Sequence, residues 1–257
     1  MKKIITSLSL FLVGMLAQAQ TAEVRKVSSF SKIEIDGRIE LVYTETEAPS
    51  IKAVAADNEK RDNLVSEINE GTLHIYMKDN SARNDETAKV YVTGSGIGSI
   101  EAKSGAKVTV KNQLSAPELS ITLDSGASFL GVIKSAKKVT LRAEKGTVFN
   151  GRAETRDFYG NFKGNAKVNL SGTAATAFIK SSNAALCLAK NFAAGQLTIK
   201  AGDFSKVSIY AKDNIDISVA EMAKVTYTGN PENVTMSENA IAIESTRLAA
   251  YAPIAEN

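Results

Sequence analysis

Four charged residues recur at nearly equal spacing in the middle of this 257-residue chain, and they are its first candidates for chemistry. The four are Lys103, Asp124, Glu144 and Lys163. If the segments that carry them stack as neighbouring strands, about 4.8 Å apart, the carboxylates of Asp124 and Glu144 would also lie about 5 Å apart. At that separation a pair of carboxylates cleaves a glycosidic bond with retention, one as nucleophile and the other as general acid.

A surface salt-bridge ladder explains the same four residues with fewer assumptions. Lys103 and Lys163 flank the two acids, so neighbouring rungs would carry opposite charges. Exposed ion pairs of this kind contribute roughly 0.2–1 kcal/mol each. The pattern therefore favours a structural ladder, and the sequence assigns no catalytic residue.

The other reactive side chains are few and isolated. His74 is the only histidine, in an alternating stretch where it is expected to face solvent between two core neighbours. Cys187 is the only cysteine, so it cannot form an internal disulfide, and its alignment with Thr109 and Leu130 predicts an outward position on a strand. The sequence contains no Cys/His cluster and no calcium-binding loop, so no metal site and no cofactor are expected.

A phrase that repeats every 18 to 21 residues would hold these side chains in place. Clear copies are Lys103–Val108, Asp124–Phe129 and Glu144–Phe149, and decayed copies continue to Glu221–Val225. One column contains only Gly, Asn and Asp, which adopt the left-handed backbone conformation at low cost. This column predicts a tight corner in every coil, at Gly105, Gly126, Gly146, Asn165, Asn183 and Asp203.

A second column, three residues further on, is large and apolar and predicts the core. Its members are Val108, Phe129, Phe149, Val168 and Leu186. The copy at Asp203 needs one extra residue to bring Val207 into line, which indicates a small bulge or a loop insertion.

Between the phrases, short runs such as Leu119–Leu123 and Val139–Ala143 alternate apolar and polar residues, the period of a half-buried strand. Short strands and corners at a period of about 20 residues are typical of a parallel β-helix. Parallel crossovers are right-handed as a rule, so the sequence predicts an all-β fold built on a right-handed parallel β-helix.

Residues 20–98 lack the repeat and are expected to form a β-rich region that packs on or caps the β-helix. Within it, Asp36-Gly37 between alternating runs predicts a β-hairpin. Asn69-Glu70-Gly71 predicts a second hairpin turn. The repeats then occupy residues 99–245, and residues 246–257 form a tail or cap.

The first 19 residues predict export. Lys2 and Lys3 are followed by the apolar run Ile4–Leu16 and by Ala17-Gln18-Ala19, the three regions of a signal peptide cleaved before Gln20. The run is shorter than the roughly 20 residues that span a bilayer, and no later segment is apolar enough to do so. The mature protein is therefore expected to lack a transmembrane segment and to reside in the periplasm, on the outer surface or outside the cell.

Composition excludes some partners. The 31 Lys and Arg residues nearly balance the 28 Asp and Glu residues and are scattered along the chain. A nucleic-acid-binding protein would show a basic stripe instead. Trp is absent and aromatic residues make up 6% of the chain, which weighs against a sugar-stacking platform.

Short motifs in a fixed order connect the chain to a known family. They are Phe30-x-x-Ile33 with Gly37 and Val42, Gly71-x-Leu73-x-Ile75, Val90-x-Val92, Ile97-x-x-Ile100, and the returning Ser104-Gly105-Ala106 and Ser125-Gly126-Ala127. On these motifs the chain, from roughly residue 30 to 245, resembles the putative auto-transporter adhesin, head GIN domain family of exported bacterial proteins. The resemblance implies a β-helical exported protein and, from the family's name, adhesion; it supplies no catalytic residues.

The sequence thus predicts an exported, non-enzymatic protein that binds or displays a glycan, a wall polymer or an envelope protein. Repeated contacts along one face would involve outward polar residues, among them Thr109, Thr122, Asn150, Asn169 and Thr226. Two alternatives stay open. A polysaccharide-active enzyme would show clustered carboxylates in a groove, and a structural or signalling accessory of the envelope would bind a protein partner and no glycan.

Overall fold

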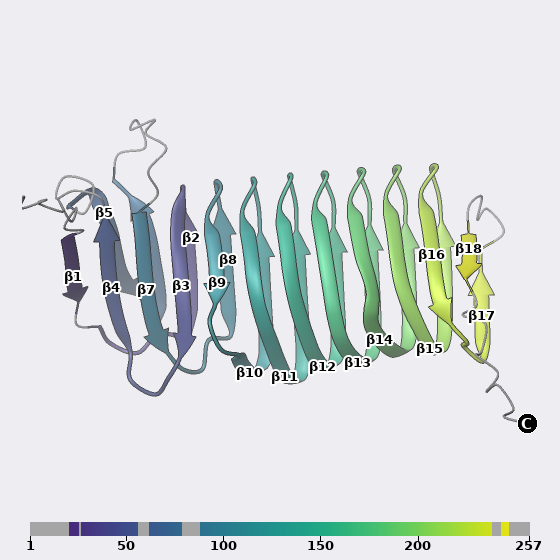
Figure 1. Cartoon of the computed structure of the whole chain (residues 1–257), viewed down its shortest axis with the longest axis horizontal. Helices are drawn as coiled ribbons and strands as arrows, with labels where there is room; N and C mark the ends of the chain where they lie inside the picture. The colour runs from purple at the N-terminus through teal and green to yellow at the C-terminus, as the bar shows by residue number, and fades with distance from the viewer. Residues whose placement is uncertain (1–20, 26, 56–61, 79–87, 238–242, 247–257) are drawn as a thin grey trace, which may run out of the picture.

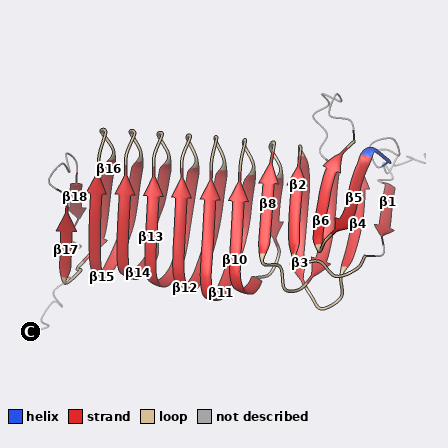
Figure 2. Ribbon diagram, turned by 180° about the vertical axis from the view of Figure 1, so that it is seen from behind, coloured by secondary structure: helices blue, strands red, loops and turns tan. Residues whose placement is uncertain are grey.

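The computed structural model describes residues 21–25, 27–55, 62–78, 88–237 and 243–246. They form an all-β solenoid of about seven turns whose coils are about 20 residues apart. Figure 1 shows the coils side by side along the long axis, with tight turns aligned along the upper edge. Figure 2 shows the same stack from behind. The predicted signal peptide, and the predicted tail beyond Thr246, lie outside the described residues.

In the middle of the repeat region each coil is one strand that bends and so serves both faces of the solenoid, whereas the coil at either end of the region is divided into two strands. In β11 (Ser128–Ala143), for example, the pairing with β12 (Val148–Phe162) is interrupted between Ser135 and Lys138 and then resumes. The short strands expected from the sequence are therefore two halves of one bent strand. The strands are β8 (Ser99–Lys103), β9 (Lys107–Val110), β10 (Leu114–Leu123), β11 (Ser128–Ala143), β12 (Val148–Phe162), β13 (Lys167–Ser181), β14 (Leu186–Ala201), β15 (Lys206–Val219), β16 (Lys224–Gly229), β17 (Asn233–Met236) and β18 (Ile243–Thr246).

Every tight corner of the repeat contains two successive residues in the left-handed region. The first positions are Ser104, Ser125, Lys145, Gly164, Asn183, Asp203 and Glu221, and the second are Gly105, Gly126, Gly146, Asn165, Ala184, Phe204 and Met222. All six residues of the predicted corner column have positive φ. The column nevertheless mixes two positions, because Asn183 and Asp203 come first in their corners and the other four come second.

This one-residue offset makes the predicted core position of Leu186 wrong. Leu186 pairs with the outward Lys167 and is partly exposed. Cys187 pairs with Val168 and is fully buried, so its predicted outward position is also wrong. Val207 pairs directly with Cys187, and the register is regular at that point, so the predicted bulge is absent from this part of β15.

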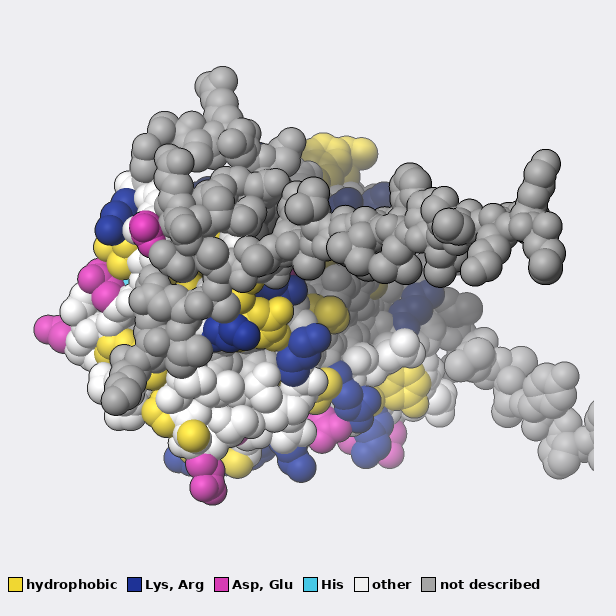
Figure 3. All heavy atoms as spheres, turned by 60° about the vertical axis from the view of Figure 1, so that its left-hand side comes forward, with side chains coloured by type: hydrophobic (Ala, Val, Ile, Leu, Met, Phe, Trp, Pro, Cys, Tyr) yellow, Lys and Arg dark blue, Asp and Glu magenta, His cyan; other side chains and the backbone are white. Residues whose placement is uncertain are grey.

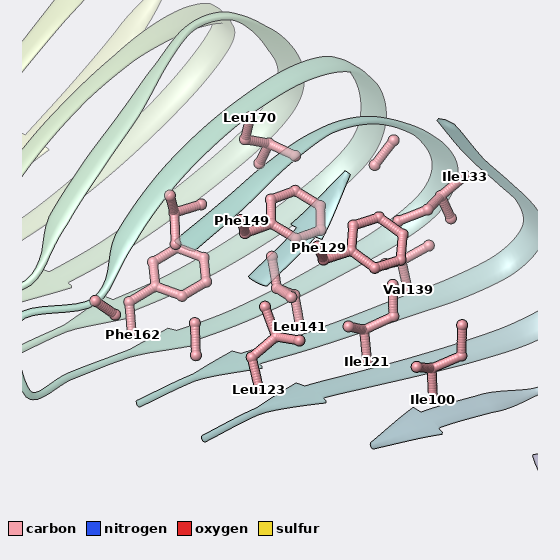
Figure 4. Close-up of a cluster of buried hydrophobic side chains, with 14 of the residues drawn as sticks. Ile100, Ile121, Leu123, Phe129, Ile133, Val139, Leu141, Phe149, Phe162 and Leu170 are labelled. Carbon is pink, nitrogen blue, oxygen red and sulfur yellow. The ribbon is translucent and has the colours of Figure 1, made fainter. Parts of the chain in front are cut away.

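The core column is continuous through the repeat coils: Val108, Phe129, Phe149, Val168, Cys187, Val207 and Val225 occupy it. Figure 4 shows the rings of Phe129 and Phe149, from successive coils, side by side. Their centroids are 5.2 Å apart and their planes differ by 6°. Glycine two residues further on makes room for each ring, because a Cβ atom at Gly151 would lie 2.5 Å from Cζ of Phe149.

The N-terminal region packs on the solenoid by extending it, out of sequence order. Strand β2 (Lys32–Asp36) pairs in parallel with β6 (Thr72–Met77) and β8, and β3 (Ile39–Glu45) pairs in parallel with β7 (Ala88–Gly94) and β9. The coil made of β2 and β3 therefore lies between two coils that follow it in the chain (Figure 1). Antiparallel strands cover that end of the stack: β1 (Thr21–Arg25) on β4 (Ser50–Ala55), β4 on β7, and β5 (Leu64–Asn69) on β6.

The predicted hairpin at Asp36-Gly37 is wrong, because β2 and β3 pair with other strands rather than with each other. Gly37 has a φ of 102° and forms a solenoid corner next to that of Ser104 and Gly105. The second predicted turn is confirmed: Glu70 and Gly71 have positive φ and join the antiparallel strands β5 and β6.

Candidate functional site

The four charged residues of the predicted ladder occupy one line just before the tight corners, but their ion pairs do not follow that line throughout. Lys163 binds Glu144 of the preceding coil at 2.9 Å. Asp124 instead binds Lys145 of the next corner, at 3.0 Å, and Lys103 binds Glu101 of its own strand. The predicted continuous ladder is therefore wrong, and separate ion pairs replace it.

Asp124 is held in its charged form. The hydrogen bond from Lys145 lowers the pKa of its carboxyl, and the backbone N–H of Ser125, 2.7 Å from Oδ1, lowers it further. A general acid needs the opposite shift, since it must keep its proton near neutral pH. Asp124 is thus poorly suited to protonate a leaving group.

His74 is partly exposed, as expected, and its Nδ1 lies 3.2 Å from the Glu34 carboxylate on the neighbouring strand. Within the part of the chain that the structure describes, no group of three or more His, Cys, Asp and Glu side chains is arranged to hold a metal ion. The same residues include no helix long and apolar enough to cross a membrane.

Cys187 is a core side chain. It is fully buried, and this burial raises the pKa of its thiol to about 12. Because the thiolate is the reactive form, both access and ionisation oppose its reaction.

We expect Cys187 in the folded protein to react with 5,5′-dithiobis(2-nitrobenzoate) at pH 8 at less than about one-hundredth of the rate of an exposed thiol. The measurement is absorbance against time, with the same protein in guanidinium chloride as the control that must react fully. Rapid stoichiometric labelling of the folded protein would contradict a buried position.

The predicted outward polar residues mostly share one surface. Thr109, Asn150, Asn169 and Thr226 lie in one line, whereas Thr122 lies on the opposite side of the solenoid. We call the surface that carries this line the asparagine face. Between Thr109 and Thr226 the line consists of Thr109, Leu130, Asn150, Asn169, Leu188, Ser208 and Thr226.

A shallow hollow of about 830 Å³ occupies the middle of the asparagine face. Leu130 and Leu188, which are 56% and 44% exposed, stand on either side of the two asparagines. Nδ2 of Asn169 donates to Oδ1 of Asn150 at 2.6 Å. This bond uses one polar group of each amide, so the amino group of Asn150 and the carbonyl of Asn169 keep hydrogen-bonding capacity for a ligand.

Charge around the hollow is basic but not continuous. Lys111, Arg152 and Lys190 line its rim, and Arg152 is paired with Glu154 at 2.7 Å. In Figure 3, which brings the N-terminal end forward, Lys and Arg side chains lie among Asp, Glu and hydrophobic side chains on the part of the surface that is not drawn in grey. The visible surface thus resembles a mixed polar surface more than a polyanion-binding stripe.

The opposite face carries an aromatic pair that the sequence analysis missed. The rings of Tyr159 and Phe178, both partly exposed, stack with centroids 5.2 Å apart, and Nζ of Lys200 lies 5.9 Å from the Phe178 centroid. Tyr159 and Phe178 are paired residues of successive coils. The signal in the sequence is their separation by one coil period, which brings two aromatic residues side by side even in a chain with few of them.

Stacked parallel coils with a bent strand per repeat define the class of β-solenoid repeat proteins, which present long regular surfaces. The chain belongs to the family described as putative auto-transporter adhesin, head GIN domain, whose sequence model matches residues 29–231. No curated protein matches the chain.

The fold is shared with several crystal structures. A putative adhesin from Parabacteroides merdae ATCC 43184 has a TM-score of 0.75 and 18% identity, over 89% of this chain and 95% of that one. One from Parabacteroides distasonis ATCC 8503 has a TM-score of 0.75 and 16% identity, over 90% and 98%. One from Bacteroides fragilis NCTC 9343 has a TM-score of 0.64 and 17% identity, over 90% and 96%. At such identities the likeness extends to the fold alone.

Proposed function

We propose that the protein is an exported, non-enzymatic, adhesin-like binding protein that holds an extended glycan on its asparagine face. The observation that carries the proposal is the line of stacked side chains in the hollow, with Asn150 and Asn169 between Leu130 and Leu188. Amide groups suit hydroxyl-rich ligands, and flanking apolar side chains suit the C–H surfaces of sugar rings. Most small-ligand sites combine the two kinds of contact in this way.

The scaffold favours a polymer over a compact ligand. Equivalent side chains on successive coils recur every ~4.8 Å, so a chain lying across the coils meets the same kind of contact several times. Linked weak contacts of this kind give an avidity well above that of each one. Export is supported by the signal-peptide pattern of residues 1–19, and adhesion by the family's description.

The non-enzymatic part of the proposal rests on the charged residues. Asp124 and Glu144 are each tied to a lysine, and the pKa of Asp124 is lowered where a general acid requires it raised. Each carboxylate is thus occupied by a lysine, and we assign both of them to structural ion pairs.

A glycan array, followed by titration of the best binder, tests the proposal. The mature chain should bind at least one extended glycan, and the double variant Asn150→Ala/Asn169→Ala should bind it about tenfold more weakly, the effect of losing one or two hydrogen bonds. Thr122→Ala/Thr140→Ala is the control, since it removes two outward polar groups from the opposite face and should leave affinity unchanged.

Three outcomes would overturn the proposal. Equal affinity of the asparagine double variant would remove the asparagine face from consideration. Release of reducing ends from a polysaccharide would support the enzyme alternative. Absence of binding to every glycan, together with one protein partner that co-purifies with the chain, would support the accessory alternative.

A further inference from the structure

The residue types at the second position of the tight corners change along the solenoid. At the second corner position the first four coils of the repeat have Gly105, Gly126, Gly146 and Asn165, and the last two have Phe204 and Met222. Phe204 and Met222 have φ values of 60° and 59°. Bulky side chains are genuine outliers in this left-handed region, whereas glycine and asparagine tolerate it.

Burial does not compensate this strain. The side chains of Phe204 and Met222 are 62% and 72% exposed, the largest exposed fractions among the exposed large hydrophobic residues that the structure describes. The same fold accepts glycine at the equivalent position of the first three coils, at Gly105, Gly126 and Gly146. Strain that persists without a packing gain is characteristic of functional positions.

The two side chains are neighbours on a narrow projecting edge. The backbone N–H of Phe204 donates to the carbonyl of Glu221 at 3.0 Å, which joins the corner of Phe204 to that of Met222. The N–H of Ala184 joins the preceding corner to Asp203 in the same way, at 2.8 Å. We call Phe204 and Met222 the apolar ridge; its corners belong to the row along the upper edge of Figure 1.

We propose that the apolar ridge inserts into a lipid surface. A protein partner would need to bury roughly 1,200 Å² or more in total for a stable interface, and an aromatic side chain contributes only about 150–250 Å². A pair of side chains at the tips of turns is convex and too small for that purpose. A lipid interface accepts projecting apolar side chains individually, with no complementary groove.

The charges beside the ridge are compatible with a bilayer surface. The exposed Lys206 follows Phe204 by two positions, within reach of phosphate headgroups. The acids at the first corner positions, Asp203 and Glu221, lie against each other, and this contact raises the pKa of Glu221. A carboxyl with a raised pKa is more readily neutralised near lipid.

This inference goes beyond the proposed function and does not depend on it. The ridge lies on the corner edge, between the asparagine face and the opposite face, so a lipid-bound molecule would still present the asparagine face to a glycan.

Flotation with vesicles of phosphatidylcholine and phosphatidylglycerol, using the whole mature chain, tests the inference. The parent protein should float with the vesicles. The variant Phe204→Gly/Met222→Gly should bind about tenfold more weakly or worse, since it loses the burial of two large side chains. Its melting temperature should stay equal or rise, because glycine relieves the left-handed strain, so lost binding cannot be attributed to unfolding.

Leu130→Ser/Leu188→Ser is the matched control. It removes two exposed apolar side chains from the asparagine face and should leave vesicle binding unchanged while affecting any glycan binding. Equal flotation of the glycine variant, or no flotation of the parent protein, would overturn the inference. Self-association of the parent protein that the glycine variant abolishes would overturn it in favour of a second copy as partner.

Discussion

Replacement of Gly172 by alanine is expected to cost about 4 kcal/mol or more of unfolding free energy, in the exceptional range for a single substitution. Gly172 has a φ of 113°, and a Cβ atom there would lie 2.0 Å from the carbonyl oxygen of Ala153 on the adjacent coil. That oxygen belongs to the ladder between β12 and β13, so it cannot move away without breaking backbone pairing. Denaturant titration of the mature protein, or its soluble yield, measures the loss.

Gly126→Ala separates the two causes of this loss of stability, the strained backbone conformation and the clash with the adjacent coil. Gly126 also has a positive φ, 76°, but nothing lies within 4 Å of a Cβ atom built there. Only the conformational cost remains, about 1–2 kcal/mol. Gly229→Ala should resemble Gly172→Ala, because its Cβ would lie 2.1 Å from the carbonyl oxygen of Ala211. Equal losses at Gly126 and Gly172 would show that close approach between coils is unimportant.

Phe149→Ala is expected to cost about 3–5 kcal/mol, the range for removal of a buried aromatic ring. Phe149 is fully buried and stacks on Phe129, so its removal leaves a cavity between coils that are fixed by backbone pairing above and below. The same backbone pairing prevents the neighbouring coils from moving inward to fill this cavity. The denaturation midpoint of the variant, with an unchanged slope, measures the effect.

Gly151 provides an internal check on this explanation. Gly151→Ala alone should be strongly destabilising, since its Cβ would lie 2.5 Å from Cζ of Phe149. In the Phe149→Ala background the ring is gone, and the second substitution should cost at least about 1 kcal/mol less than it does alone. Some cost should remain, because the carbonyl oxygen of Gly131 lies 3.1 Å from the same Cβ position. Additive effects would mean that the ring does not select glycine here.

The solenoid was predictable because its signals repeat. Positive φ at Gly105 and burial at Phe129 and Phe149 follow from residue type alone, and the period locates them in successive coils. The offset at Asn183 was not predictable in this way. The second corner position is occupied by Ala184, Phe204 and Met222 in the later coils. These residue types do not favour the left-handed conformation, so residue type alone does not locate the second corner position there.

The sequence also did not reveal which strand or side chain each segment pairs with. The Asp36-Gly37 signal correctly locates a corner, but the same chemistry serves a hairpin and a solenoid turn, and only distant strands decide between them. Asp124 likewise selects Lys145, whose position depends on the shape of the next corner. The line from Asn150 to Asn169 follows from the coil period. The placement of Thr122 on the opposite face depends on where the strands bend, which the alternation of residues does not reveal.

Because the coil of β2 and β3 lies between two coils that are synthesised after it, neither of its edges has a partner when it emerges. Folding one coil at a time from the first strand onward is therefore blocked. One edge of this coil gains its partners when the chain has reached Gly94, and the other only when it has reached Val110. In the folded molecule, the same interleaved order of strands opposes stepwise unfolding from the N-terminal end. Unzipping from this end cannot proceed one coil at a time in sequence order, as it can in an ordinary solenoid, because the early segment is clamped by two later ones.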